Sequence, residues 1–175
     1  MNMRIWTAGI LVAGLLASGA AFASAVIPPP KPKDAGPQIF RYALIFTGKA
    51  TPGKAGTHFT ARTSVKLPRT FNRTIAGGLN TASFQSLVTL RKKQPGTFYE
   101  KGTITFGSGT LMFKPTTPGT MGPSPAAGVN SGHVIWRVTG GTGAFVGASG
   151  TIASVFTSRE DGSLTDTQAA VIFLK

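Results

Sequence analysis

The chain has 175 residues and a formal net charge of +13, because 18 lysines and arginines stand against 5 aspartates and glutamates. Charged residues make up only 13% and apolar residues 41%, a composition that excludes a charge-rich disordered chain. There is no cysteine, so disulfides, thiolate nucleophiles, iron–sulfur clusters and cysteine-based zinc sites are excluded.

The N-terminal segment has the layout of a secretory signal peptide. Arg4 precedes an uncharged stretch over residues 5–22, and small residues at alternate positions follow. We predict a signal peptide over residues 1–23, with cleavage after Ala23 or Ala25, which would place the mature protein in the periplasm or outside the cell. An uncleaved membrane anchor is the alternative, because the uncharged stretch has the minimum length for a bilayer span.

Prolines mark the next segment. Four prolines between positions 26 and 36 favour polyproline II and exclude a central β-strand. We therefore predict a Pro-rich tether over residues 24–37, which joins the cleavage site to a folded domain over residues 38–175. A proline motif that binds another protein module is the alternative interpretation.

The folded domain is predicted to be all-β. From Gln38 onward no helical apolar period runs for more than two turns, and apolar residues alternate within short segments bounded by Gly, Pro and Asn. The alternation is clear where Phe40, Tyr42, Leu44 and Phe46 share one face. About eight strands are predicted, over residues 39–47, 59–67, 84–90, 97–106, 110–114, 134–139, 151–158 and 165–174.

The connections predict how these strands pair. Parallel pairing would need helical segments between strands, and none is evident. Residues 107–109 and Asp161-Gly162 have the composition of tight hairpin turns. Because alternate apolar side chains can fill a closed interior and closure removes exposed edges, we predict an eight-stranded antiparallel β-barrel. Residues 115–132, rich in Gly and Pro, are predicted to be a long structureless loop, mobile rather than a functional lid.

A glycine cluster lies between the last predicted strands and includes Gly140, Gly141, Gly143 and Gly147. A phosphate-binding loop would need a lysine and a following helix, so nucleotide binding is not predicted. We interpret these glycines as a structural turn, in which positive φ and close backbone approach let a strand turn a barrel corner.

The same segment, residues 138–152, resembles the Gly-Gly-Thr-Gly-x-Phe-x-Gly-Ala-x-Gly pattern of the allene oxide cyclase/dirigent barrel superfamily. Residues 102–111 resemble the strand–turn–strand that precedes this pattern in bacterial members. The resemblance covers the C-terminal two thirds of the chain and implies an eight-stranded antiparallel barrel with an apolar interior. Plant members cyclise a fatty-acid epoxide or steer the coupling of phenoxy radicals, but we find no match to their catalytic pattern, so those activities are not carried over.

Few residues could support catalysis. His58 and His133 are the only general-base candidates near neutral pH. Glu100 and Asp166 fall within predicted strands, where an inward-facing carboxyl group with a raised pKa would be a candidate catalytic acid. We expect both instead to face water beside lysines and arginines, because acids are rarely buried unpaired. No histidine pair has metal-ligand spacing, so no metal and no cofactor are predicted.

The excess of basic residues is the other feature of the sequence that bears on function. Arg91, Lys92 and Lys93 form a run at the end of a predicted strand and are candidate anion-binding residues. A cationic surface attracts anionic lipid headgroups and polyanions, so an anionic envelope surface is a predicted partner. The alternative is that the basic residues only keep the protein soluble. Aromatic residues are not interleaved with the basic ones, so dedicated nucleic-acid binding is not predicted.

Together these features favour a secreted or periplasmic barrel that binds a small apolar or amphiphilic ligand without catalysis. Two alternatives stay open. One is a cyclase or isomerase acting on an apolar substrate inside the barrel, and the other is a basic structural protein of the cell envelope. The sequence does not indicate the oligomeric state.

Overall fold

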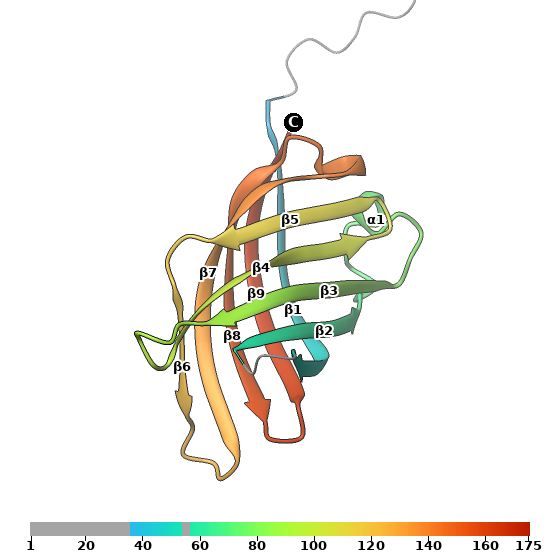
Figure 1. Cartoon of the computed structure of the whole chain (residues 1–175). Helices are drawn as coiled ribbons and strands as arrows, with labels where there is room; N and C mark the ends of the chain where they lie inside the picture. Colours follow the sequence, from blue (N-terminus) through green and yellow to red (C-terminus); the bar gives the residue numbers. More distant parts are fainter. Residues whose placement is uncertain (1–35, 54–56) are drawn as a thin grey trace, which may run out of the picture. The chain divides into compact units, whose positions relative to one another are not determined.

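The computed structural model describes residues 36–53 and 57–175 (Figure 1). The predicted signal peptide over residues 1–23, and the predicted tether up to residue 35, lie outside the described residues and stay predictions. The described part contains nine strands, one short α-helix and one 3-10 helix. The elements are β1 (Gln38–Pro52), β2 (His58–Lys66), α1 (Arg73–Ala76), β3 (Thr81–Leu90), β4 (Thr97–Phe106), β5 (Gly109–Pro115), β6 (Gly119–Pro123), β7 (Val129–Gly141), η1 (Gly143–Phe145), β8 (Ser149–Arg159) and β9 (Ser163–Leu174).

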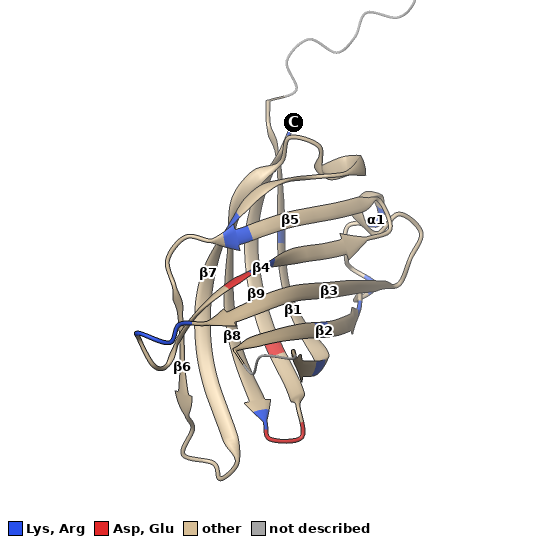
Figure 2. Ribbon diagram, viewed as in Figure 1, with Lys and Arg blue, Asp and Glu red and all other residues tan. Residues whose placement is uncertain are grey.

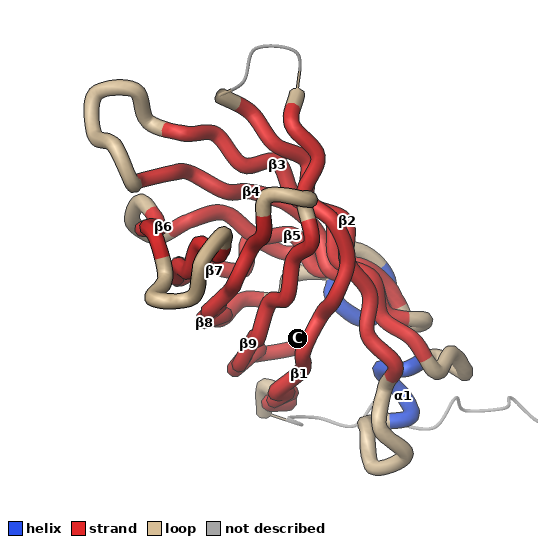
Figure 3. The backbone as a smooth tube through the Cα atoms, turned by 90° about the horizontal axis from the view of Figure 1, so that it is seen from below, coloured by secondary structure: helices blue, strands red, loops and turns tan. Residues whose placement is uncertain are grey.

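Eight of the strands close into an antiparallel barrel, which confirms the predicted fold class. The order around the ring is β1-β2-β3-β4-β5-β7-β8-β9, and β9 pairs back onto β1 (Figures 1 and 3). The closing pair runs in register from Gln38 opposite Leu174 to Lys49 opposite Ser163. The ring therefore has no open edge along these eight strands.

The ninth strand, β6, corrects the prediction of a structureless loop over residues 115–132. It pairs with the start of β4 on one side and with β7 on the other, and β7 itself begins within that stretch. A Cβ at Gly119 would lie 2.4 Å from Cζ of the Phe98 ring, so only glycine lets β6 pack here. The Gly and Pro content suggested a loop, but at Gly119 the glycine serves close packing within a sheet.

Side-chain alternation fills the barrel. On β1 the four residues predicted to share one face, from Phe40 to Phe46, are buried while their neighbours are exposed. Trp136 on β7 and Ile172 on β9 are fully buried in the same core. Removal of this apolar surface from water is the main term that stabilises the closed ring.

A cluster of aromatic side chains fills and closes one end of the barrel. The rings of Phe71 and Phe106 stack with their centroids 5.6 Å apart, and Phe40 packs edge-on against both. Phe145, which belongs to η1, packs against Phe106. Phe71 precedes α1, whose Ile75 is buried in the core, so the two helical segments cover this end.

The glycine cluster lies beside this closed end. Gly140, Gly143 and Gly147 have φ values of +121°, +57° and +69°, a region that favours glycine. A Cβ at Gly143 would lie 2.1 Å from the backbone oxygen of Ser108, and one at Gly141 would lie 2.1 Å from that of Thr110. Close backbone approach is therefore required at both Gly141 and Gly143.

These contacts predict different costs for two substitutions in the cluster. Gly143→Ala should lower the free energy of unfolding by more than about 2 kcal/mol, because it combines a strained φ with a backbone clash. Gly147→Ala should cost only about 1 kcal/mol, because its Cβ would meet the flexible side chain of Lys175. Urea denaturation of both variants measures the difference, and equal losses would contradict a close-packing role for Gly143.

Candidate functional site

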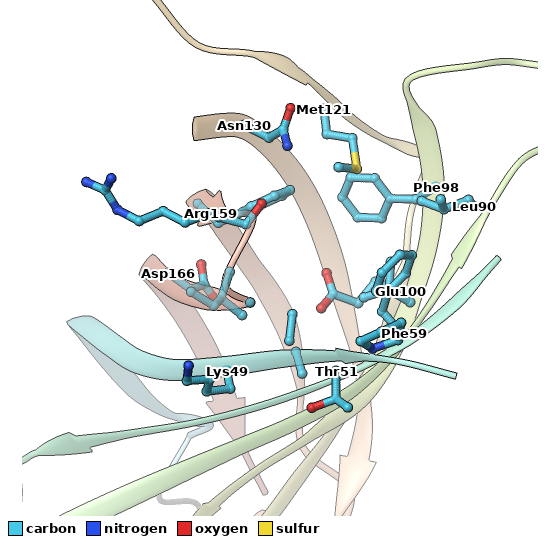
Figure 4. Close-up of a pocket in the computed structure, with 18 of the residues that line it drawn as sticks. Lys49, Thr51, Phe59, Leu90, Phe98, Glu100, Met121, Asn130, Arg159 and Asp166 are labelled. Atoms are coloured by element: carbon cyan, nitrogen blue, oxygen red, sulfur yellow. The ribbon is translucent and has the colours of Figure 1, made fainter. Parts of the chain in front are cut away.

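The open end of the barrel contains a cavity of about 500 Å³ (Figure 4). Its walls come from β1, β3 and β8 towards their ends, from β2, β4, β7 and β9 near their starts, and from β6. The larger apolar side chains that line it are Phe59, Phe84, Val88, Leu90, Phe98, Met121, Phe156 and Leu164. This volume lies within the range of roughly 300–1,000 Å³ that is typical of small-molecule sites.

Acidic residues gather at this cavity. Four of the five acids in the sequence lie in the described part of the chain (Figure 2), and all four line the cavity. Glu160 and Asp161 belong to the β8–β9 turn at the mouth, where Lys49 and Arg159 also lie. The rim thus carries both signs of charge.

The β8–β9 turn follows the hairpin chemistry expected from Asp161-Gly162. Gly162 has a φ of +80°. The backbone N–H and the hydroxyl of Ser163 each donate to the Asp161 carboxylate, at 2.8 Å. These hydrogen bonds, helped by the charges of Lys49 and Arg159, hold the pKa of Asp161 below its usual range. Lys49 Nζ also donates to the backbone oxygen of Asp161 at 3.2 Å, which ties β1 to this turn.

Glu100 on β4 faces the barrel interior, so the expectation that it faces water is wrong. Only 6% of the residue is exposed, and Ser86 Oγ on the neighbouring strand β3 donates to its Oε1 at 2.5 Å. Burial raises the pKa of Glu100 from 4.5 to about 8, and the nearby charge of Asp166 also raises it, while the Ser86 hydrogen bond opposes the change. At pH 7 this carboxyl group therefore keeps its proton.

Asp166 on β9 is also buried, with 3% of the residue exposed, so the expectation that it faces water is wrong as well. Ser154 Oγ donates to Oδ1 and Gln168 Nε2 donates to Oδ2, both at 2.6 Å. The Gln168 amide oxygen in turn accepts from the Tyr42 hydroxyl at 3.2 Å. Burial raises the pKa of Asp166, and its two hydrogen bonds oppose this. Neutral hydroxyl and amide groups, rather than lysines or arginines, are the hydrogen-bond donors to both acids.

The two carboxyl groups have different surroundings. Asp166 accepts a hydrogen bond at each oxygen, whereas Glu100 accepts one at Oε1 from Ser86. The negative charge of Asp166 disfavours ionisation of Glu100 and so raises the pKa of Glu100 further. The cavity floor thus pairs two buried acids, and Glu100 is the one shown to keep its proton at neutral pH and so to be able to donate a hydrogen bond.

The other candidate residues lie outside this cavity. His58 and His133 are exposed on the outer faces of β2 and β7. The basic run forms the turn after β3 (Figure 2), and that strand ends at Leu90, which lines the cavity. Arg91 donates to the Gln94 side chain, and its guanidinium lies 5.1 Å from the centre of the Tyr99 ring.

Lys92 and Lys93, which complete the run, are exposed. Nowhere in residues 36–53 and 57–175 do three or more His, Asp or Glu side chains gather as a metal-ion site would require. Neither helical segment of these residues is long and apolar enough to span a bilayer.

The fold and the cavity define a class: an antiparallel β-barrel with an apolar cavity at one end. No protein-family model, no curated protein and no solved structure matches the chain. The resemblance to the allene oxide cyclase/dirigent superfamily therefore stays a prediction from the glycine pattern.

The buried Glu100 predicts how stability depends on pH. The folded state holds this proton up to a pH of about 8, whereas the unfolded chain releases it near 4.5. Unfolding between these values releases a proton, so the free energy of unfolding should fall by a few kcal/mol as the pH rises through this window. Glu100→Gln should remove most of this loss.

Urea denaturation at several pH values between 4.5 and 9 measures this effect. Glu160→Gln is the matched control, because it makes the same carboxyl-to-amide replacement at the cavity mouth, where the residue is exposed. The buried-acid interpretation is contradicted if Glu100→Gln has the same pH dependence as the unsubstituted protein.

Proposed function

We propose that this chain is an exported protein that binds a small apolar or amphiphilic ligand in the open end of its barrel, without catalysis. The observation that carries the proposal is the cavity of about 500 Å³ with its wall of aromatic and aliphatic side chains. The other end of the barrel is filled by its own aromatic residues, so the open end is where a ligand of this class would fit.

The physics of the cavity supports an apolar ligand. A ligand that fills it removes both its own apolar surface and the wall from water, which contributes about 25 cal/mol per Å². The wall is fixed by paired strands, so little conformational freedom is lost on binding. Lys49 and Arg159 at the rim are placed to meet the polar head of an amphiphile that stays near water.

A substitution that fills the cavity tests this proposal. Val88 on β3 lines the cavity, opposite Glu100 in the β3–β4 register. Val88→Trp should weaken binding of the neutral dye N-phenyl-1-naphthylamine at least about ten-fold, because the indole occupies the ligand volume. Dye fluorescence on titration measures the affinity.

Val155→Trp is the matched control, because Val155 is 61% exposed on the outer face of β8. It should leave dye binding unchanged. If both substitutions weaken binding equally, or if neither does, the dye does not occupy the cavity and the proposal fails.

A cyclase or isomerase acting on an apolar substrate is the second candidate function. The observation that favours it is that Glu100 and Asp166 face one cavity in different hydrogen-bonding environments. Two carboxyl groups whose surroundings separate their pKa values are a recurrent arrangement for general acid–base chemistry. The exposed Lys92 and Lys93 beside the mouth support an anionic envelope surface as a partner of either kind of protein.

Native mass spectrometry of the purified protein separates the two candidates. We expect a co-purified apolar molecule that is recovered chemically unchanged after incubation with the protein. Conversion of that molecule by the unsubstituted protein, lost in Glu100→Gln or Asp166→Asn while far-ultraviolet circular dichroism stays the same, would replace the binding function with the enzymatic one.

A further inference from the structure

We propose that the cavity floor recognises one uncharged oxygen atom of the ligand, a carbonyl, ether or hydroxyl oxygen, through a hydrogen bond donated by the Glu100 carboxyl group. This inference rests on the proposed binding function and narrows its ligand class. The ligand would be an apolar molecule that enters the barrel with its oxygen-bearing end first.

The first support is the orientation of Glu100. Its carboxyl group projects into the cavity from β4 (Figure 4). Ser86 holds Oε1 at 2.5 Å, and no hydrogen bond within the described residues involves Oε2. The Ser86 hydrogen bond therefore fixes the carboxyl group at Oε1, and the hydroxyl of the neutral acid can donate to a ligand from Oε2.

The second support is an incomplete hydrogen-bond arrangement beside this acid. The Trp136 side chain is fully buried, and its Nε1 has no hydrogen-bond partner in the described part of the chain. Nε1 nevertheless faces Glu100 closely enough to favour the charged carboxylate, although the contact lacks normal hydrogen-bond geometry. Buried donors without partners are uncommon, so the hydrogen bonds of the polar groups around Glu100 are not completed by the chain itself.

Asp166 affects which charge a ligand group at the cavity floor can carry. Each of its oxygens already accepts a hydrogen bond, from Ser154 or Gln168, so the chain itself takes up part of the accepting capacity of Asp166. The charged form of Asp166 would repel a carboxylate or phosphate at the floor. A cationic amine would pair with Glu100 as an ion only after Glu100 had lost its proton. Binding of a cationic amine is therefore less favourable here than binding of a neutral oxygen.

Three probes with a common ring test the inference: cyclododecanone, cyclododecane and cyclododecylamine. Each is titrated against N-phenyl-1-naphthylamine bound to the full chain at pH 6. Glu100→Leu should weaken cyclododecanone about ten-fold more than cyclododecane, since one neutral hydrogen bond is lost only with the ketone. Glu100→Gln, which restores an N–H donor, should recover most of the ketone affinity relative to Glu100→Leu.

The pH dependence adds a readout that a purely structural role would not give. The ketone-specific part of the affinity should fade in the unsubstituted protein as the pH rises through about 8, where Glu100 ionises. Asp166→Asn removes the charge that raises the pKa of Glu100, so in this variant the additional affinity for the ketone should be lost at a lower pH. In Glu100→Gln this loss should be absent.

The outcomes distinguish this inference from the proposed function. If cyclododecane and cyclododecanone both displace the dye but lose affinity equally in Glu100→Leu, the oxygen site is overturned while ligand binding stands. Tighter binding of cyclododecylamine than of cyclododecanone at pH 6 overturns it in favour of a cation site. If no probe displaces the dye and none binds by native mass spectrometry, the binding function itself fails.

Discussion

The pairing of the first strand with the last is the constraint on which the rest of the structure depends. Hydrogen bonds between β1 and β9 join residues more than a hundred positions apart in the chain and close the sheet into a ring. Closure sends every second side chain into an enclosed interior. The packed aromatic end, the open cavity and the burial of two acids all follow from that one connection.

The interior of this ring is divided along its axis. Aromatic side chains around Phe106 fill one end, apolar side chains around Phe98 line the cavity at the other, and polar groups lie between them. These polar groups form two hydrogen-bonded clusters, one around Glu100 and one around Asp166. Buried carboxyl groups are unfavourable for stability. Their place at the floor of a cavity is the structural basis for assigning them a role with a ligand.

The distribution of charge reinforces this division. The lysines and arginines of the described strands, such as Arg62 and Lys101, are exposed, and neither buried acid is held by a basic side chain. A lysine or arginine beside Glu100 would have held it as a carboxylate. Because serine, glutamine and tryptophan surround the acids instead, the cavity keeps a proton near neutral pH inside a strongly cationic protein.

The sequence by itself determined the eight strands of the ring and their antiparallel pairing, because a period of two in residues such as Phe40 to Phe46 and turn residues such as Asp161-Gly162 act locally. It did not predict β6, because the need for glycine at position 119 comes from the ring of Phe98, which belongs to another strand. Nor did it orient Glu100 and Asp166 or find Ser154, Gln168 and Trp136 around them. Those positions depend on which strands become neighbours when the ring closes, and only the tertiary structure decided that.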